Sequence, residues 1–167
     1  LLAKSETGYH NLLKLSSKGF LEGFYYKPRV DKELLEQYHE GLIALSGCLQ
    51  GEVARLILER RRRDAEAAAR WYKETFGDFY LEIQAHGIPE QEKVNKAIID
   101  MSKKLDIPLV ATNDTHYLEK EDAPIHDMLL CIQTQSTVHD KKRMKMADDS
   151  FYLRSPEEMS RLFAECP

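Results

Sequence analysis

The sequence contains no apolar run approaching the ~18 residues of a membrane span, and its first residues lack the order of a signal peptide. Positive charge is not in excess, because 24 Lys and Arg side chains stand against 28 Asp and Glu side chains. The net charge of −4 excludes overall basicity as a way to attract nucleic acid, so such a contact needs a local patch. No internal repeat or low-complexity linker divides the chain, which predicts one main domain and no membrane partner.

Cysteine is scarce, and its number is odd. Cys48, Cys131 and Cys166 are widely spaced, which argues against a disulfide framework and predicts a cytoplasmic protein with free or metal-bound thiols. The chain opens with LLAKSETGYH, without an initiating methionine, and stops at LFAECP. We therefore expect a piece of a longer protein.

Helical and strand-like segments alternate along the chain. Capping residues and apolar periodicity predict helices from Ser5 to Gly19 or Gly23, and at 31–41, 51–77 (one helix, or two separated near 62–64), 89–106, 121–135 and 155–165. Apolar runs predict strands at residues 42–48, 78–84, 107–114 and 150–155. This order predicts a parallel α/β barrel or open sheet whose strands are buried on both faces. A polar stretch predicts a boundary near residue 140, which divides the chain into 1–140 and 141–167.

The run LVATNDTHYL, residues 109–118, places the carboxylate of Asp114 and the imidazole of His116 directly after an apolar strand. Burying either group without a partner costs free energy. Residues two apart on a strand point to one face, so Asp114 and His116 are expected to project together. Cys48 holds the corresponding position after the run LIALSG, and sites in parallel α/β folds lie at these carboxyl ends. A carboxylate, an imidazole and a thiolate suit zinc or a similar divalent ion.

Each of these residues also has an ordinary structural explanation. Cys48 alone fits a small buried hydrophobic residue, Asp114 alone fits a cap or Asx turn, and His116 alone fits a hydrogen bond to a carbonyl. Their joint placement at strand ends is what favours a metal site.

Two further residues lie near the predicted site. Glu82 alternates with apolar neighbours and would face a barrel interior, although a structural ion pair is the favoured use. His86, in QAHG, is interpreted as a loop residue that lines the site. No role is assigned to His10, His39, His126 and His139, and the run Arg60–Arg63 is interpreted as a solvated helix surface.

Five motifs occur in an order that resembles one known family. They are LLAKSETGYHNLLKLSSKGFLEGFYYKPRVD, GLIALSGCLQGEVARLI, FYLEIQAHG, LVATNDTHYLEKEDAPIHDMLLCIQT and SFYLRSPEEMSRLF. Together they resemble the PHP (polymerase and histidinol phosphatase) domain of bacterial replicative DNA polymerase III alpha subunits. The resemblance implies a distorted (β/α)7 barrel, here partial because its N-terminal strands are missing, and a trinuclear metal site. Cys48, Asp114 and His116 match ligand positions, and the other ligands are expected upstream of Leu1.

The resemblance also implies a function for the parent protein, which is DNA-directed DNA synthesis by a nucleotidyltransferase. The PHP domain itself is implied to hydrolyse phosphodiesters as a 3′–5′ exonuclease with zinc, manganese or magnesium. The alternatives are a structural platform that binds the proofreading exonuclease subunit, and a free-standing PHP phosphoesterase. The expected partners are DNA, the exonuclease subunit and other replicase subunits. In the isolated piece we expect inactivity, weak or absent metal binding, and self-association through open barrel edges.

Overall fold

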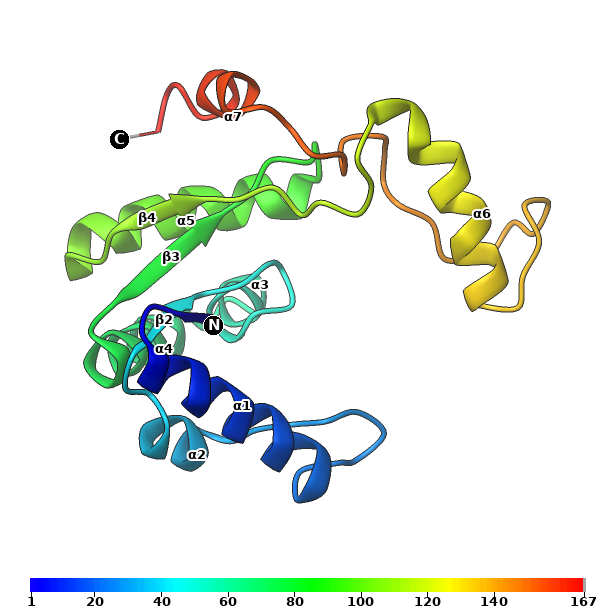
Figure 1. The fold of residues 1–167 in the computed structure, drawn as a ribbon. Helices are drawn as coiled ribbons and strands as arrows, with labels where there is room; N and C mark the ends of the chain where they lie inside the picture. The colour runs from blue at the N-terminus through cyan, green and yellow to red at the C-terminus, as the bar shows by residue number, and fades with distance from the viewer. Residues whose placement is uncertain (167) are drawn as a thin grey trace.

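The computed structural model describes residues 1–166, so Pro167, the last residue of the predicted connection 141–167, lies outside it. The fold is mixed α/β and contains a four-stranded open sheet in the order β1-β2-β3-β4 (Figure 1). The strands are β1 (Leu2–Ala3), β2 (Leu42–Leu45), β3 (Phe79–Ile83) and β4 (Leu109–Ala111). Strands β2, β3 and β4 run parallel, whereas β1, which the sequence did not predict, pairs antiparallel with β2. The α/β prediction is therefore confirmed.

Seven α-helices and one short 3-10 helix occur in the described residues. They are α1 (Glu6–Leu21), α2 (Lys32–Gln37), α3 (Glu52–Leu58), α4 (Arg62–Phe76), α5 (Pro89–Leu105), η1 (Lys120–Asp122), α6 (Ala123–Gln133) and α7 (Pro156–Leu162). The predicted caps are confirmed. Ser5 accepts a hydrogen bond from the backbone N–H of Gly8 at 3.1 Å, and Ser155 forms a capping box with Glu158.

The core lies between one face of the sheet and the helices that pack on it. Phe79, Leu81 and Ile83 of β3 are buried, whereas Tyr80 and Glu82 between them are only partly buried. The expected burial of the strands on both faces is therefore wrong. The helical layer formed by α3, α4 and α5 lies on one side of the strands, and the second face of this open sheet carries no equivalent layer in residues 1–166 (Figure 1).

Two predicted helices differ from those observed, and local backbone geometry explains both. The helix predicted at 31–41 ends at Gln37, because the chain leaves helical geometry at Tyr38 and Gly41 adopts φ 73° at the entry to β2. The long segment at 51–77 forms two helices. Arg60 adopts a left-handed φ of 60°, and the Arg61 N–H bonds back to the Leu56 carbonyl at 2.9 Å, which ends α3.

The strand predicted at 150–155 is not formed, and this prediction is wrong. The segment makes one isolated bridge, between Tyr117 and Tyr152. At this bridge the Phe151 carbonyl accepts the Tyr117 N–H at 3.4 Å and the Leu153 N–H donates to the Tyr117 carbonyl at 3.1 Å. The Tyr152 carbonyl accepts the Asn113 side-chain amide instead of a backbone N–H. Backbone pairing in this segment is therefore limited to one residue pair.

The chain divides by packing into a body, residues 1–112, and an arm, residues 113–166. The buried members of the main hydrophobic core lie between Leu15 and Ile107, inside the body, and the partly buried Phe163 and Cys166 of the arm pack against this core. The arm leaves the end of β4, and its helix α6 projects away from the sheet (Figure 1). Across the part of the chain that the structure covers, no helix is long and apolar enough to cross a membrane.

Candidate functional site

The structure brings Asp114 and His116 together directly after β4. The Asp114 Oδ1 atom lies 3.3 Å from the His116 Nε2 atom, and both side chains remain accessible to solvent. The His116 backbone is held from the arm side by the hydrogen bond to Phe151. The two side chains thus meet in the segment that follows the carboxyl end of β4, and the carboxylate stands where it orients the imidazole.

Cys48 lies in the turn that follows β2. Gly47 adopts φ 79°, a conformation that L side chains rarely adopt, and this turn leaves the Cys48 thiol exposed. The interpretation of Cys48 as a buried hydrophobic residue is therefore wrong. Residues 1–166 contain no group of three or more His, Cys, Asp or Glu side chains placed to hold a metal ion. Cys48 does not join the Asp114–His116 pair in such a group, and the assignment of these three residues as ligands stays a prediction.

Glu82 connects the carboxyl ends of three parallel strands. Its Oε2 atom accepts the Gly47 N–H after β2 at 3.1 Å, and its Oε1 atom accepts the Thr112 hydroxyl after β4 at 2.5 Å. Oε1 also accepts the Gln84 side-chain amide at 3.1 Å. Within the described chain Glu82 makes no ion pair, so the favoured ion-pair interpretation is wrong. Neutral donors satisfy the carboxylate instead and fix the strand ends that carry the candidate site.

His86 is buried beside this network, with only 2% of its surface exposed. Its ring stacks on the Phe151 ring with centroids 4.5 Å apart, and its backbone N–H donates to the Gln91 side-chain oxygen at 2.7 Å. Desolvation lowers the pKa of His86 and outweighs the hydrogen bond from Gln91 and the charge of Asp114, which act in the opposite direction. The ring is therefore neutral near pH 7.

The tautomer of His86 follows from its neighbour. Since the Gln91 side-chain oxygen is already bonded to the His86 backbone, its amide nitrogen faces the ring and donates to Nδ1 at 3.3 Å. The ring proton is then on Nε2, which is buried and has no hydrogen-bond partner in residues 1–166. His86 therefore presents one unpaired donor to the interior beside the Glu82 network, and its assignment as a residue that lines the site stays a prediction.

Two residues that sequence reasoning left without a role complete the surroundings of the pair. The His126 ring lies 5.5 Å from the His116 ring, and Phe151 meets the edge of the same imidazole at 5.8 Å. Phe151 therefore separates His86 from His116, while α6 supplies a third imidazole. No spacing in the sequence links residues 86, 116, 126 and 151, because only the return of the arm brings them together.

Comparison with known proteins identifies the family of this chain. The model of the PHP domain family matches residues 1–86, which is half of the chain. The chain belongs to the PHP domain family. This PHP chain is 51% identical over its whole length to DNA polymerase III subunit alpha of Borreliella burgdorferi and to that of Treponema pallidum. It is 49% identical over 99% of its length to DNA polymerase III subunit alpha of Thermus aquaticus. The PHP chain spans only 14–15% of the length of these three relatives.

Asp114 and His116 of this PHP chain are ligand types that suit a divalent ion, but two ligands are too few to hold one. A carboxylate and an imidazole in contact are suitable donors, whereas a protein zinc site uses three or four protein ligands. The described residues bring two donors together, so they do not by themselves complete a site.

Proposed function

We propose that this PHP chain is part of a DNA polymerase III alpha subunit, and that the parent protein is a cytoplasmic DNA-directed DNA polymerase. The observation that carries the proposal is the 51% identity to two such subunits across the entire chain. The parallel strands β2, β3 and β4 would form part of a distorted (β/α)7 barrel, with a boundary near residue 140. DNA and the other replicase subunits would be partners of the parent protein.

Within that parent, Cys48, Asp114 and His116 would hold divalent metal together with donors from other segments. A bound zinc, manganese or magnesium ion supplies Lewis-acid chemistry for phosphodiester hydrolysis. The contribution of this chain is positional. The carboxylate of Asp114 orients the imidazole of His116, and the Glu82 network holds the strand ends in place.

Two activities of the intact polypeptide test this proposal. We expect template-directed primer extension by the intact polypeptide and none by residues 1–167 alone. Hydrolysis of a 3′-labelled strand should fall about a hundredfold in the variants Asp114→Asn and His116→Ala, while extension continues. The matched control is Asp100→Asn, which changes an exposed carboxylate on α5. Equal hydrolysis by all variants would contradict the assignment of the pair, and absence of template-directed extension would contradict the assignment of the parent.

A structural platform for the proofreading exonuclease subunit is the second candidate, and the surface of α6 favours it. Ile125, Met128, Leu129 and Ile132 recur at helical spacing on α6 and are all more than half exposed. The stripe bears no charge, and the one acidic side chain of α6, Asp127, is paired with Arg143. Such a stripe suits an apolar groove on another replicase subunit.

The platform role predicts that binding depends on the α6 stripe and not on metal. Ile132→Asp in the intact polypeptide should weaken binding of the purified exonuclease subunit at least about tenfold in calorimetry. The control His139→Asp introduces the same charge at an exposed residue outside the stripe. Unchanged affinity in the Ile132 variant would eliminate the platform role of α6.

A further inference from the structure

Four aromatic side chains are exposed where α1 ends and the chain turns toward α2. Phe20 lies in the last turn of α1, and Phe24, Tyr25 and Tyr26 follow it. Their exposed fractions range from 58% to 82%. We call the segment that carries them, residues 20–30, the aromatic tip. Large aromatic surfaces left in water on a folded domain mark a site of interaction.

The aromatic tip has a defined backbone rather than an extended one. A Cβ atom at Gly23 would lie 2.1 Å from the Arg29 carbonyl oxygen, so the returning chain passes directly against the end of α1. The Tyr25 N–H donates to the Lys27 carbonyl at 3.1 Å, and Tyr26 between them adopts φ 58°. A left-handed tyrosine costs of order 1 kcal/mol, so its neighbours must hold this turn in place. The turn presents both tyrosine rings outward.

Positive charge is in excess around the aromatic tip, in the segment formed by the tip and the residues that flank it, although the whole chain is acidic. Residues 14–32 hold five basic minus two acidic side chains, a net charge of +3, whereas the whole chain carries −4. Glu22 pairs with Lys18 at 2.9 Å, Asp31 caps α2, and Lys32 pairs with Glu52 at 3.0 Å, so the cations of the tip itself, Lys27 and Arg29, are the ones to consider.

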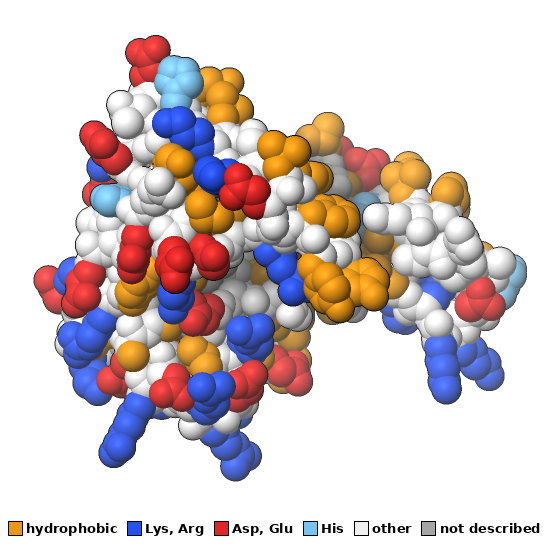
Figure 2. All heavy atoms as spheres, turned by 90° about the horizontal axis from the view of Figure 1, so that it is seen from below, with side chains coloured by type: hydrophobic (Ala, Val, Ile, Leu, Met, Phe, Trp, Pro, Cys, Tyr) orange, Lys and Arg blue, Asp and Glu red, His pale blue; other side chains and the backbone are white. Residues whose placement is uncertain are grey.

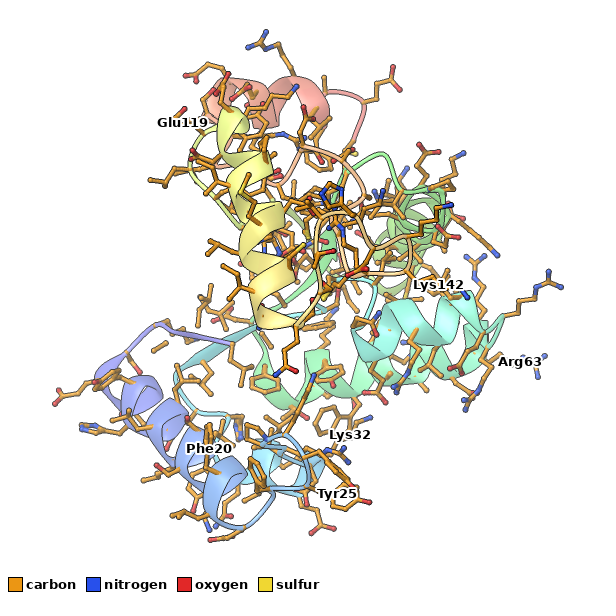
Figure 3. All side chains as sticks on the ribbon, turned by 90° about the vertical axis from the view of Figure 1, so that its right-hand side faces the viewer. Phe20, Tyr25, Lys32, Arg63, Glu119 and Lys142 are labelled. Carbon is orange, nitrogen blue, oxygen red and sulfur yellow. The ribbon has the colours of Figure 1, made fainter. Side chains whose placement is uncertain are left out.

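The remaining cations of the aromatic tip are available to a ligand. Lys27 and Arg29 form no ion pair within residues 1–166, and the Arg29 guanidinium lies 5.2 Å from the centroid of the Tyr25 ring. Figure 2 shows hydrophobic side chains beside blue cationic ones on this side of the body. Figure 3 shows Phe20, Tyr25 and Lys32 at the same end of the molecule.

We propose that the aromatic tip binds single-stranded nucleic acid. Exposed rings offer stacking surfaces for unpaired bases, and the cations between them meet the phosphates that join those bases. An apolar protein groove would leave Lys27 and Arg29 desolvated and unpaired, which is costly. A second copy of the chain would oppose two surfaces of the same positive sign. A polyanion with planar bases satisfies both features of the tip. The proposal rests on the tip alone and is independent of the metal site.

The test is fluorescence anisotropy with a labelled oligo(dT) of about 16 nucleotides, titrated with the chain at low and near-physiological salt. Lys27→Glu with Arg29→Glu should weaken binding about tenfold or more and reduce its salt dependence. Tyr25→Ala with Tyr26→Ala should weaken binding by about tenfold. Tyr26→Gly removes one ring from a backbone conformation that glycine adopts without strain, so this variant should fold and still bind more weakly.

The matched control is Arg60→Glu with Arg63→Glu, which makes the same change of net charge. Arg63 lies well away from Tyr25 (Figure 3), so this control should keep its affinity within about twofold. A parallel titration with oligo(rU) shows whether RNA or DNA is the preferred strand. Binding of either strand that depends on the residues of the aromatic tip supports the proposal. Equal loss in the tip and control variants, equally tight binding of duplex DNA, or binding of neither single strand would overturn it. Self-association that the tyrosine variants abolish, without strand binding, would instead assign the tip to a second copy.

Discussion

The body and the arm of this PHP chain are held together by different forces. The body contains a continuous hydrophobic core between the sheet and α3, α4 and α5. In the described arm the buried hydrophobic residues are Leu130, Cys131 and Phe151. The arm instead uses polar and aromatic contacts, such as the Arg154 guanidinium, which donates to the Ala85 carbonyl and the Asn113 side chain at 3.1 Å. Hydrophobic burial therefore fixes the body, whereas a few directional contacts and the packing of Phe163 and Cys166 on the body core position the arm that carries Asp114 and His116.

The largest expected effect is in the body. Phe79 is almost completely buried and stacks on Tyr72 with ring centroids 5.3 Å apart. Phe79→Ala should lower the free energy of unfolding by about 3–5 kcal/mol, because it removes apolar contacts and leaves a cavity. The control Ile125→Ala, at an exposed position of α6, should change it by less than about 0.5 kcal/mol. Urea titration measures both values, and similar losses would remove the contrast between body and arm.

The next effect is in the arm itself. Phe151 is buried against His86, and its backbone carbonyl fixes His116. Phe151→Ala should cost about 2–3 kcal/mol of docking free energy, since fewer apolar neighbours surround it than surround Phe79. Hydrogen exchange should then accelerate at the amides of His116 and Leu153, while the amides of β3 stay protected. Loss of protection across β3 would show that body and arm unfold as one unit.

A smaller effect concerns the segment that returns along α6. Arg143 donates two hydrogen bonds to Asp127, at 2.5 and 2.7 Å, and the Arg143 guanidinium lowers the pKa of Asp127. Because the pKa of Asp127 is depressed in the folded chain, the contribution of this contact to stability is fully present above about pH 3.8. It is lost as the pH falls further. Arg143→Met should increase tryptic cleavage after Lys141 and Lys142 severalfold at neutral pH. Unchanged cleavage would mean that other contacts hold the segment.

The smallest effect is expected from the loss of one polar contact within the body. The Tyr72 hydroxyl donates to Glu52 at 3.0 Å, and burial, followed by the charge of Glu52, raises the pKa of Tyr72 to about 12. A raised folded pKa means that its contribution to stability is full below pH 10 and declines as the pH rises toward 12. Tyr72→Phe should cost only about 1 kcal/mol at pH 7. An ultraviolet titration should show a tyrosine that ionises late in the wild type and is missing from the variant. A wild type without a late-ionising tyrosine would contradict this contact.

Features set by neighbouring residues could be predicted from the sequence. The caps Ser5 and Ser155 depend on a spacing of three residues and were predicted. The contact between Asp114 and His116 was predicted too, but from a strand reaching past them, whereas β4 ends at Ala111. The break at Arg60 was predicted as one of two outcomes and was placed a few residues late, because its left-handed conformation carries no glycine signal.

Features set by the return of the arm could not be predicted. The segment 150–155 has the residues of a strand, yet it pairs with the backbone only at Tyr117, and the Tyr152 carbonyl accepts the Asn113 side-chain amide. The stacking of His86 on Phe151 joins a residue of the body to one far along the arm, and no local pattern encodes it. The use of Glu82 to tie three strands together likewise depends on the parallel register.

We propose that Asp114 and His116 are two donors of a metal site that needs further ligands from the parent polypeptide. Equilibrium dialysis against zinc and manganese, of the chain and of the intact polypeptide in parallel, tests it directly. We predict weak binding by residues 1–167, tight binding by the intact polypeptide, and a loss of at least about tenfold in affinity with Asp114→Asn or His116→Ala. Several tightly bound equivalents in the isolated chain, or full metal content in both variants, would contradict the claim.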